Sequence, residues 1–75
     1  MNIYFFGQLT DITQVHQIEI NDAADTESLL VKLAERFPQL ANAKFTLAIN
    51  NTIITKNTPL TNCDSVALMP PFSGG

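Results

Sequence analysis

The chain has 75 residues, of which 45% are hydrophobic and 15% are charged, which suits one small core and leaves no room for a second. Its net charge is −3 and its four cations are scattered, so we expect no nucleic-acid partner, because phosphate binding needs clustered basic side chains. No apolar run approaches the ~20 residues that cross a bilayer, so we expect no membrane span. No basic residue precedes the first apolar segment, and one cysteine allows no internal disulfide. Both features predict a cytoplasmic protein.

The first twenty residues predict two strands joined by a polar connection. Residues 2–6 read N-I-Y-F-F, an apolar run typical of a strand buried on both faces. Gly7 ends this strand, and the polar stretch 8–14 follows it. Residues 15–20 then alternate between apolar and polar side chains, which predicts a second strand.

The middle of the chain predicts the one main helix. Thr26 is a suitable N-cap, because its hydroxyl can accept a hydrogen bond from a free N–H of the first turn. Apolar side chains then recur at helical spacing, at Leu29, Leu30, Leu33, Ala34 and Phe37. Pro38 ends the helix, because the residue before a proline disfavours the α conformation.

The remainder predicts three more strands, over residues 45–49, 52–55 and 65–69. Asn50-Asn51 suits the two-residue turn between the first two of them, because asparagine tolerates positive φ. Leu60 lies between two predicted turns, and we expect it in the core. The last strand is also apolar on both faces.

The order strand, strand, helix, strand, strand, strand belongs to the α+β class. Because the first and last strands are the least polar, we expect them to lie side by side and parallel in the middle of a mixed five-stranded sheet, with the helix across one face. This arrangement is the β-grasp, or ubiquitin-like roll. We predict a β-grasp domain over residues 1–69 and a flexible Gly-Gly tail over residues 70–75.

The predicted body contains no catalytic or metal-binding pattern. His16 is the only histidine, and we expect it to be solvated. Cys63 is followed by Asp64, whose charge opposes thiolate formation. Asp22 and Asp25 precede the helix, where a carboxylate has a purely local electrostatic role. We therefore predict no catalytic residue, no metal ligand and no bound cofactor.

The C-terminal segment, Pro70-Pro71-Phe72-Ser73-Gly74-Gly75, is the most informative part of the sequence. A Gly-Gly end carries its carboxylate on a thread without side chains, which can enter a channel too narrow for a Cβ atom. These six residues extend to ~20 Å. The carboxylate needs activation before it can carry a group, and attack on the α-phosphate of ATP would give an acyl-adenylate that sulfur converts into a thiocarboxylate. A partner must bind that ATP, because the chain has no phosphate-binding loop.

Three blocks of the sequence resemble the small subunit of molybdopterin synthase, a β-grasp sulfur carrier. They are F-F-G-Q-L at 5–9, L-A-I-N-N with I-I at 47–54, and the whole segment 59–75. The resemblance implies that a ubiquitin-activating-like adenylyltransferase uses ATP to adenylate Gly75, which then becomes a thiocarboxylate. It further implies that the tail enters the large catalytic subunit and donates sulfur to cyclic pyranopterin monophosphate.

The resemblance also assigns roles to individual residues. Gly75 is the modified residue, Gly74 and Ser73 lie in the threaded tail, and the partner-binding residues are Phe72, Pro71, Pro70, Met69 and Phe6. The chain itself would be the non-catalytic subunit of a heterotetrameric transferase. We also expect an apolar patch for the partner, made of Phe5, Phe6, Val66, Leu68 and Met69.

One turn departs from the family pattern. Residues 62–64 read N-C-D where the family usually has Asp-Gly-Asp, so a positive φ at Cys63 would cost on the order of 1 kcal/mol. The tail chemistry does not depend on this turn.

Three other functions fit the same tail. The first is the thiamine-pathway sulfur carrier, whose members usually lack Pro-Pro before the tail. The second is a protein modifier joined through Gly75 to a lysine of its target. The third is an interaction module whose terminal glycines have no role.

Overall fold

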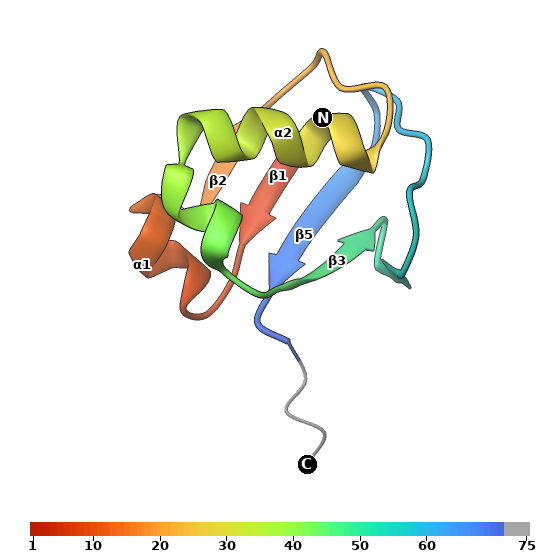
Figure 1. The fold of residues 1–75 in the computed structure, drawn as a ribbon. Coiled ribbons are helices and arrows are strands. Elements are labelled where there is room, and N and C mark those ends of the chain that lie inside the picture. The colour runs from red at the N-terminus through yellow and green to blue at the C-terminus, as the bar shows by residue number, and fades with distance from the viewer. Residues whose placement is uncertain (72–75) are drawn as a thin grey trace.

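The fold is a five-stranded mixed sheet with one main helix across it (Figure 1). The computed structural model describes residues 1–71. The elements, in chain order, are β1 (Asn2–Phe5), α1 (Leu9–Thr13), β2 (Gln17–Glu19), α2 (Thr26–Arg36), the 3-10 helix η1 (Pro38–Asn42), β3 (Thr46–Ile49), β4 (Thr52–Ile54) and β5 (Ser65–Met69). The strand order is β2-β1-β5-β3-β4, and β1 pairs with β5 in parallel. The predicted β-grasp arrangement is confirmed.

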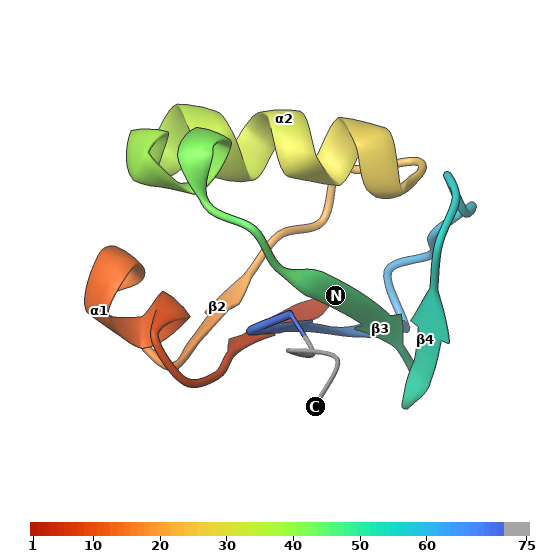
Figure 2. The ribbon, with the colours of Figure 1, turned by 60° about the horizontal axis from the view of Figure 1, so that its bottom comes forward.

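The core lies between α2 and the sheet face that α2 covers, which we call the inner face (Figure 2). Side chains at alternate positions of β1 and β5 meet there with one side of α2. Fully buried side chains from these three elements are Ile3, Phe5, Leu29, Leu33, Val66 and Leu68. Each buried side chain of this size stabilises the fold by about 1.5–3 kcal/mol. Leu60 is buried beside them, as predicted.

The opposite sheet face, the outer face, has no helix over it in the described part of the chain (Figure 2). Successive side chains of a strand point to opposite faces. The residues that alternate with the buried ones, such as Tyr4, Ala67 and Met69, therefore point to the outer face, and they are only half-buried. Phe6, directly after β1, is 49% exposed. The prediction that the first and last strands are buried on both faces is therefore wrong.

Helix α2 begins one residue away from the predicted cap. Asp25 is the N-cap, and its Oδ1 accepts a hydrogen bond of 2.9 Å from the Ser28 N–H. Thr26 is instead the first helical residue, and its buried hydroxyl donates to Asn57 Oδ1 at 3.0 Å. The reason is tertiary: Thr58 N–H also donates to the Thr26 hydroxyl, at 3.0 Å, so the threonine ties the helix to a distant loop.

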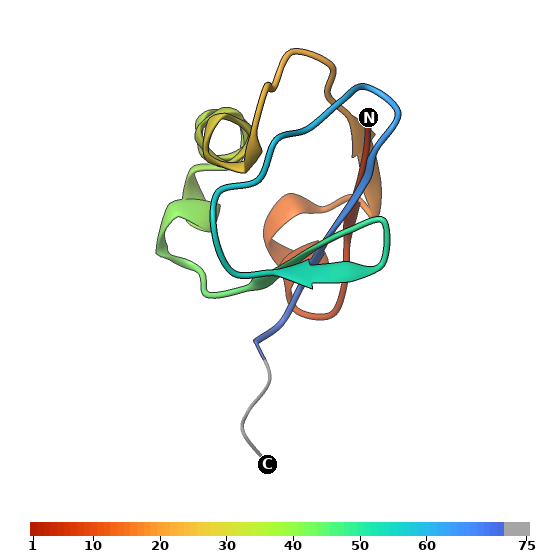
Figure 3. The ribbon, with the colours of Figure 1, turned by 90° about the vertical axis from the view of Figure 1, so that its right-hand side faces the viewer.

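That loop, residues 55–64, runs past the start of α2 on its way to β5 (Figure 3). Thr26 N–H donates to the Thr58 carbonyl at 3.0 Å, and Leu60 N–H donates to the Ala24 carbonyl at 2.9 Å. These backbone contacts hold the loop against the helix start and bring Leu60 into the core.

The other end of α2 follows the prediction. The helix ends at Arg36, and Pro38 starts the 3-10 helix η1, which the sequence analysis did not anticipate. Phe37 lies between them and packs edge-on against Phe5, with 5.7 Å between ring centroids. Neither α1 nor α2 has the length and apolar character needed to cross a membrane.

The stretch 8–14, predicted as a polar connection, contains the short helix α1. Leu9 and Thr13 are its buried side chains, and Gln14 ends it in the left-handed conformation with φ 64°. One turn of helix is too short for periodicity to reveal, and packing of Leu9 on the core stabilises it. Strand β2 consequently starts at Gln17 and not at residue 15.

The two predicted turns have different outcomes. Asn50 and Asn51 have φ of 50° and 71°, which confirms the two-residue hairpin between β3 and β4. Cys63 is not among the described residues with positive φ. The strain considered for that turn is therefore absent.

Candidate functional site: the tail root and the outer sheet face

The predicted site residues fall into two groups. Phe72, Ser73, Gly74 and Gly75 lie outside the described residues 1–71, so their proposed roles stay predictions. The others lie on the described part of the chain, on its surface or half-buried, at Phe6, Met69, Pro70 and Pro71.

The tail leaves the domain from the end of β5, beside the turn between β1 and α1 (Figure 1). Phe6 N–H donates to the Leu68 carbonyl at 3.0 Å, which extends the parallel pairing to the end of the sheet. Pro70 then lies against Gly7, which has φ +58°. Phe6, Met69 and Pro70 are thus brought to one end of the molecule, and Gly7 is a neighbour that the sequence analysis did not identify.

On the outer face the central strands place small and aromatic side chains next to one another. Ala67 of β5 is paired in register with Tyr4 of β1 on one side and with Ala48 of β3 on the other, and Met69 is paired with Thr46. A shallow hollow of about 390 Å³ lies over these strands. We define the outer-face patch as Tyr4, Phe6, Thr46, Ala48, Ile53, Ala67 and Met69.

The predicted apolar patch was partly wrong. Phe5, Val66 and Leu68 are core residues, since strand alternation sends them to the inner face. Phe6 and Met69 are available on the other side, and their binding role stays a prediction. The sequence analysis missed Tyr4, although its spacing of two from Phe6 was the available signal.

The charge of the outer face favours a protein partner. Among the strand residues that point to it, Glu19 is the only charged one. Apolar side chains with few charges lose little solvation when another protein covers them. The half-exposed Phe6 and Ile53 (49% and 50% exposed) supply the kind of large side chain that anchors an interface.

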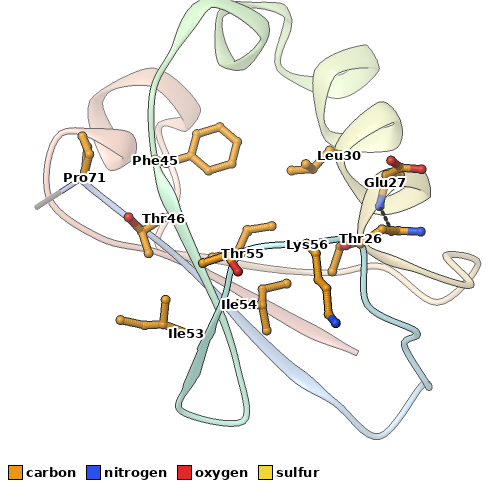
Figure 4. Close-up of a pocket in the computed structure, with 12 residues that line it drawn as sticks. Thr26, Glu27, Leu30, Phe45, Thr46, Ile53, Ile54, Thr55, Lys56 and Pro71 are labelled. Atoms are coloured by element: carbon orange, nitrogen blue, oxygen red, sulfur yellow. Dashed lines mark hydrogen bonds between the residues drawn. The ribbon is translucent and has the colours of Figure 1, made fainter.

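A second hollow, a groove of about 590 Å³, lies between the first half of α2 and the β3–β4 hairpin (Figure 4). Pro71 and Glu27 lie at opposite ends of it in this view, and apolar side chains such as Leu30 and Phe45 line it. Asn57 Oδ1, which lies in this groove, already accepts a hydrogen bond of 2.9 Å from the Glu27 N–H. The lining of the groove contains no histidine or cysteine.

The titratable groups singled out in the sequence do not converge. His16 and Cys63 are both exposed. Hydrogen bonds from the Ser28 backbone and from Asn57 hold the pKa of Asp25 below its ordinary value. The Thr61 backbone and Asn50 do the same to the pKa of Asp64. Within residues 1–71 no cluster of histidine, cysteine and acidic side chains is suited to hold a metal ion.

The fold and the tail together define the class of the protein. A β-grasp roll whose central last strand continues directly into Pro-Pro and a Gly-Gly end has the form of a ubiquitin-like carrier. The chain belongs to the ThiS family, whose family model matches residues 3–75.

Known proteins agree with this assignment over the full length. The chain is 31% identical, over 100% of its length and 99% of the relative, to the "Molybdopterin synthase sulfur carrier subunit" of Haemophilus influenzae. It is similar to a chain in the complex of subunits 1 and 2 of molybdopterin-converting factor from Helicobacter pylori, with a TM-score of 0.71, 28% identity and coverage of 99% and 96% of the two chains.

The small archaeal modifier protein 1 of Methanosarcina acetivorans is also similar, with a TM-score of 0.81, 18% identity and coverage of 99% and 94% of the two chains. At this level of identity the similarity shows the shared fold alone.

Proposed function

We propose that this chain is the sulfur-carrier subunit of a molybdopterin synthase. The observation that carries the proposal is the full-length similarity to a relative of that name, 31% identical over all of this chain. The sequence from Pro70 to Gly75 supports it, because it supplies a side-chain-free terminal carboxylate after a rigid Pro-Pro base. The chain has no catalytic role of its own in this proposal.

The chemistry takes place at Gly75. A carboxylate oxygen attacks the α-phosphorus of ATP held by an adenylyltransferase, and pyrophosphate leaves. A hydrosulfide-level sulfur nucleophile then attacks the acyl carbon, AMP leaves, and Gly75 ends as a thiocarboxylate. In the large subunit the thiocarboxylate sulfur attacks a carbon of the pterin precursor, and the oxygen substituent of that carbon leaves. Hydrolysis of the acyl–sulfur bond then leaves the sulfur on the precursor and returns the Gly75 carboxylate. ATP is thus a co-substrate of the partner, and this activation suits a cytoplasmic protein.

The outer-face patch is the surface that we propose for the large subunit. It adjoins Pro70 at the end of β5, so a partner seated on Phe6 and Met69 would receive the tail without any rearrangement of the sheet. The nearly uncharged face and its half-exposed aromatic side chain are the physical reason for choosing it over the charged surface of α2.

The test of the proposal is the intact mass of the protein after incubation with ATP, a sulfur donor and the adenylyltransferase of the same organism. We expect a gain equal to the exchange of one oxygen for sulfur, located on the C-terminal peptide. Gly75→Ala should abolish the gain and leave the folding transition unchanged, and the exposed Gln39→Ala serves as the matched control. Normal loading of Gly75→Ala would contradict the threaded-tail argument.

The sulfur pathway is decided by a second measurement on the loaded protein. With the molybdopterin large subunit and the pterin precursor it should form the dithiolene product, whereas with a thiazole synthase it should transfer no sulfur. The reverse result would identify a thiamine-pathway carrier. Isopeptide adducts through Gly75 in a cell lysate would identify a protein modifier, and full function without Gly75 would identify an interaction module.

A further inference from the structure

The turn between β1 and α1 contains a contact that only glycine permits. A Cβ atom on Gly7 would lie 2.6 Å from Pro70 Cγ and 3.2 Å from Pro70 Cδ, and real Cβ atoms essentially never approach another atom as closely as the first distance. The proline ring therefore occupies the space that a side chain at residue 7 would need. The φ of +58° at Gly7 is a second, separate reason for glycine.

The turn itself is held rigidly from several directions. The Gly7 carbonyl accepts hydrogen bonds from the Thr10 N–H at 3.2 Å and from the Thr10 hydroxyl at 2.8 Å. On one side of the turn, Phe6 N–H is bonded to the Leu68 carbonyl. On the other side, Leu9 is buried in the core. Gly7 therefore cannot shift without disturbing both the sheet and α1.

Pro70 and Pro71 also border a small hollow of about 250 Å³ beside this turn. Its other walls come from α1 and from the segment before β3, at Gln8, Leu9, Ile12, Ala43 and Lys44. Pro70 is itself exposed and lies against Gly7, while its own ring fixes its φ. The start of the tail is therefore placed against the turn between β1 and α1.

We propose that Gly7 is a positioning residue that fixes, through its contact with Pro70, the direction in which the chain leaves the domain after β5. This inference rests on the proposed function, because the direction matters only if Gly75 must reach a reacting atom in another protein. If the first residue of the tail is fixed, less conformational entropy is lost when the tail docks. Small misplacements of a reacting group also reduce reaction rates strongly. Gly7 touches no reacting atom and acts entirely through Pro70.

The rival explanation is that Gly7 serves only the backbone, through its positive φ. Gly7→Asn separates the two, because asparagine tolerates positive φ and yet introduces a Cβ atom against the proline ring. The background variant Pro70→Ala removes Cγ and Cδ and keeps only Cβ, which lies 4.0 Å from the new atom, an ordinary contact. The two single variants and the double variant form a double-mutant cycle that isolates the contact.

The experiment measures kcat and KM for sulfur loading of the four proteins, together with their urea unfolding curves. We expect Gly7→Asn to lower kcat roughly tenfold in the wild-type background and less than twofold in the Pro70→Ala background. Within each background Gly7→Asn should change KM by less than about twofold, because Gly7 is not one of the predicted partner-binding residues. Gly7→Asn should lower the unfolding free energy more in the wild-type background than in the Pro70→Ala background, because the clash with the proline ring exists only in the former.

Three outcomes would overturn the inference. They are an equal loss of kcat in both backgrounds, no loss in either, and the absence of a nuclear Overhauser effect between the Gly7 Hα protons and the Pro70 ring protons in the wild-type protein. Failure of the proposed function looks different, because then the wild-type protein itself gains no sulfur. In that case the sulfur-carrier function no longer gives a reason for a fixed tail direction, even if the contact between Gly7 and Pro70 is observed.

Discussion

The two faces of the sheet are built from the same strands and both carry large apolar side chains, yet they have different physical roles. Phe5 and Phe6 are neighbours in the sequence, and they are 2% and 49% exposed. The inner face is covered by α2 and supplies the free energy of folding. The outer face keeps its large apolar side chains half-exposed, which stabilises the isolated domain little and favours binding of a partner. The comparison shows that hydrophobicity alone does not distinguish a core from an interface.

The largest expected effect tests this division at the two neighbouring phenylalanines. Phe5→Ala should lower the free energy of unfolding by about 3–5 kcal/mol, because it leaves a cavity beside Phe37 and the helix. Phe6→Ala should lower it by less than about 1 kcal/mol, because solvent already reaches the ring. Urea unfolding followed by circular dichroism measures both. Similar losses for the two variants would mean that the outer face belongs to the folding core.

The second prediction concerns binding to the partner, for which the outer face should matter more than the rest of the surface. Phe6→Ser should weaken binding to the large subunit by roughly tenfold or more, as expected for an interface aromatic residue. Val31→Ser is the matched control, because Val31 is 59% exposed on the solvent side of α2 and should have no effect. Titration calorimetry with the purified large subunit measures both. A loss for Val31→Ser, with none for Phe6→Ser, would place the interface on the helix layer.

The third prediction concerns the stability of the protein at acid pH, where the aspartates of two loops become protonated. Hydrogen bonds lower the pKa of Asp25 and of Asp64 below the ordinary value of 3.8. A carboxyl group with a lowered pKa in the folded state stabilises the protein above the ordinary pKa, and this stabilisation is lost as the pH falls through the folded pKa. Stability should thus decline below about pH 4.

In the double variant Asp25→Asn with Asp64→Asn, the stability of the protein should depend less on pH in this acid range. Thermal unfolding between pH 6 and pH 2 would follow the decline. An unchanged slope in the double variant would assign it to other carboxyl groups. Binding through the outer-face patch, measured well above pH 4, should change little, because neither aspartate belongs to it.

The smallest expected effect concerns α1, at the end of the sheet where the tail begins. Gln14 ends this helix with φ 64°, a conformation that glycine adopts without steric cost. Gln14→Gly should therefore stabilise the domain by up to about 1 kcal/mol, partly offset by the greater freedom of the unfolded chain. A chemical-denaturation curve of this variant gives the answer. A destabilised variant would show that the hydrogen bond from Gln14 Nε2 to the Asp11 carbonyl outweighs the backbone strain.

The sequence by itself determined the fold class and the position of the chemistry. The apolar periodicity of residues 29–37 defined the helix, the two least polar runs defined the central strands, and the segment from Pro70 to Gly75 indicated a carrier. These features are local patterns, so they can be read along the chain. The resemblance to a sulfur carrier depended on the same segments.

Only the tertiary structure decided which side of each strand is covered, and with it the true membership of the partner surface. Phe5, Val66 and Leu68 looked like surface candidates in the sequence, and strand alternation together with the single helix layer made them core. The cap of α2 moved from Thr26 to Asp25 because a loop some thirty residues away in sequence binds the threonine hydroxyl. The contact of Gly7 with Pro70 joins segments from opposite ends of the chain. A pattern along the sequence does not show that two such distant residues lie close together in space.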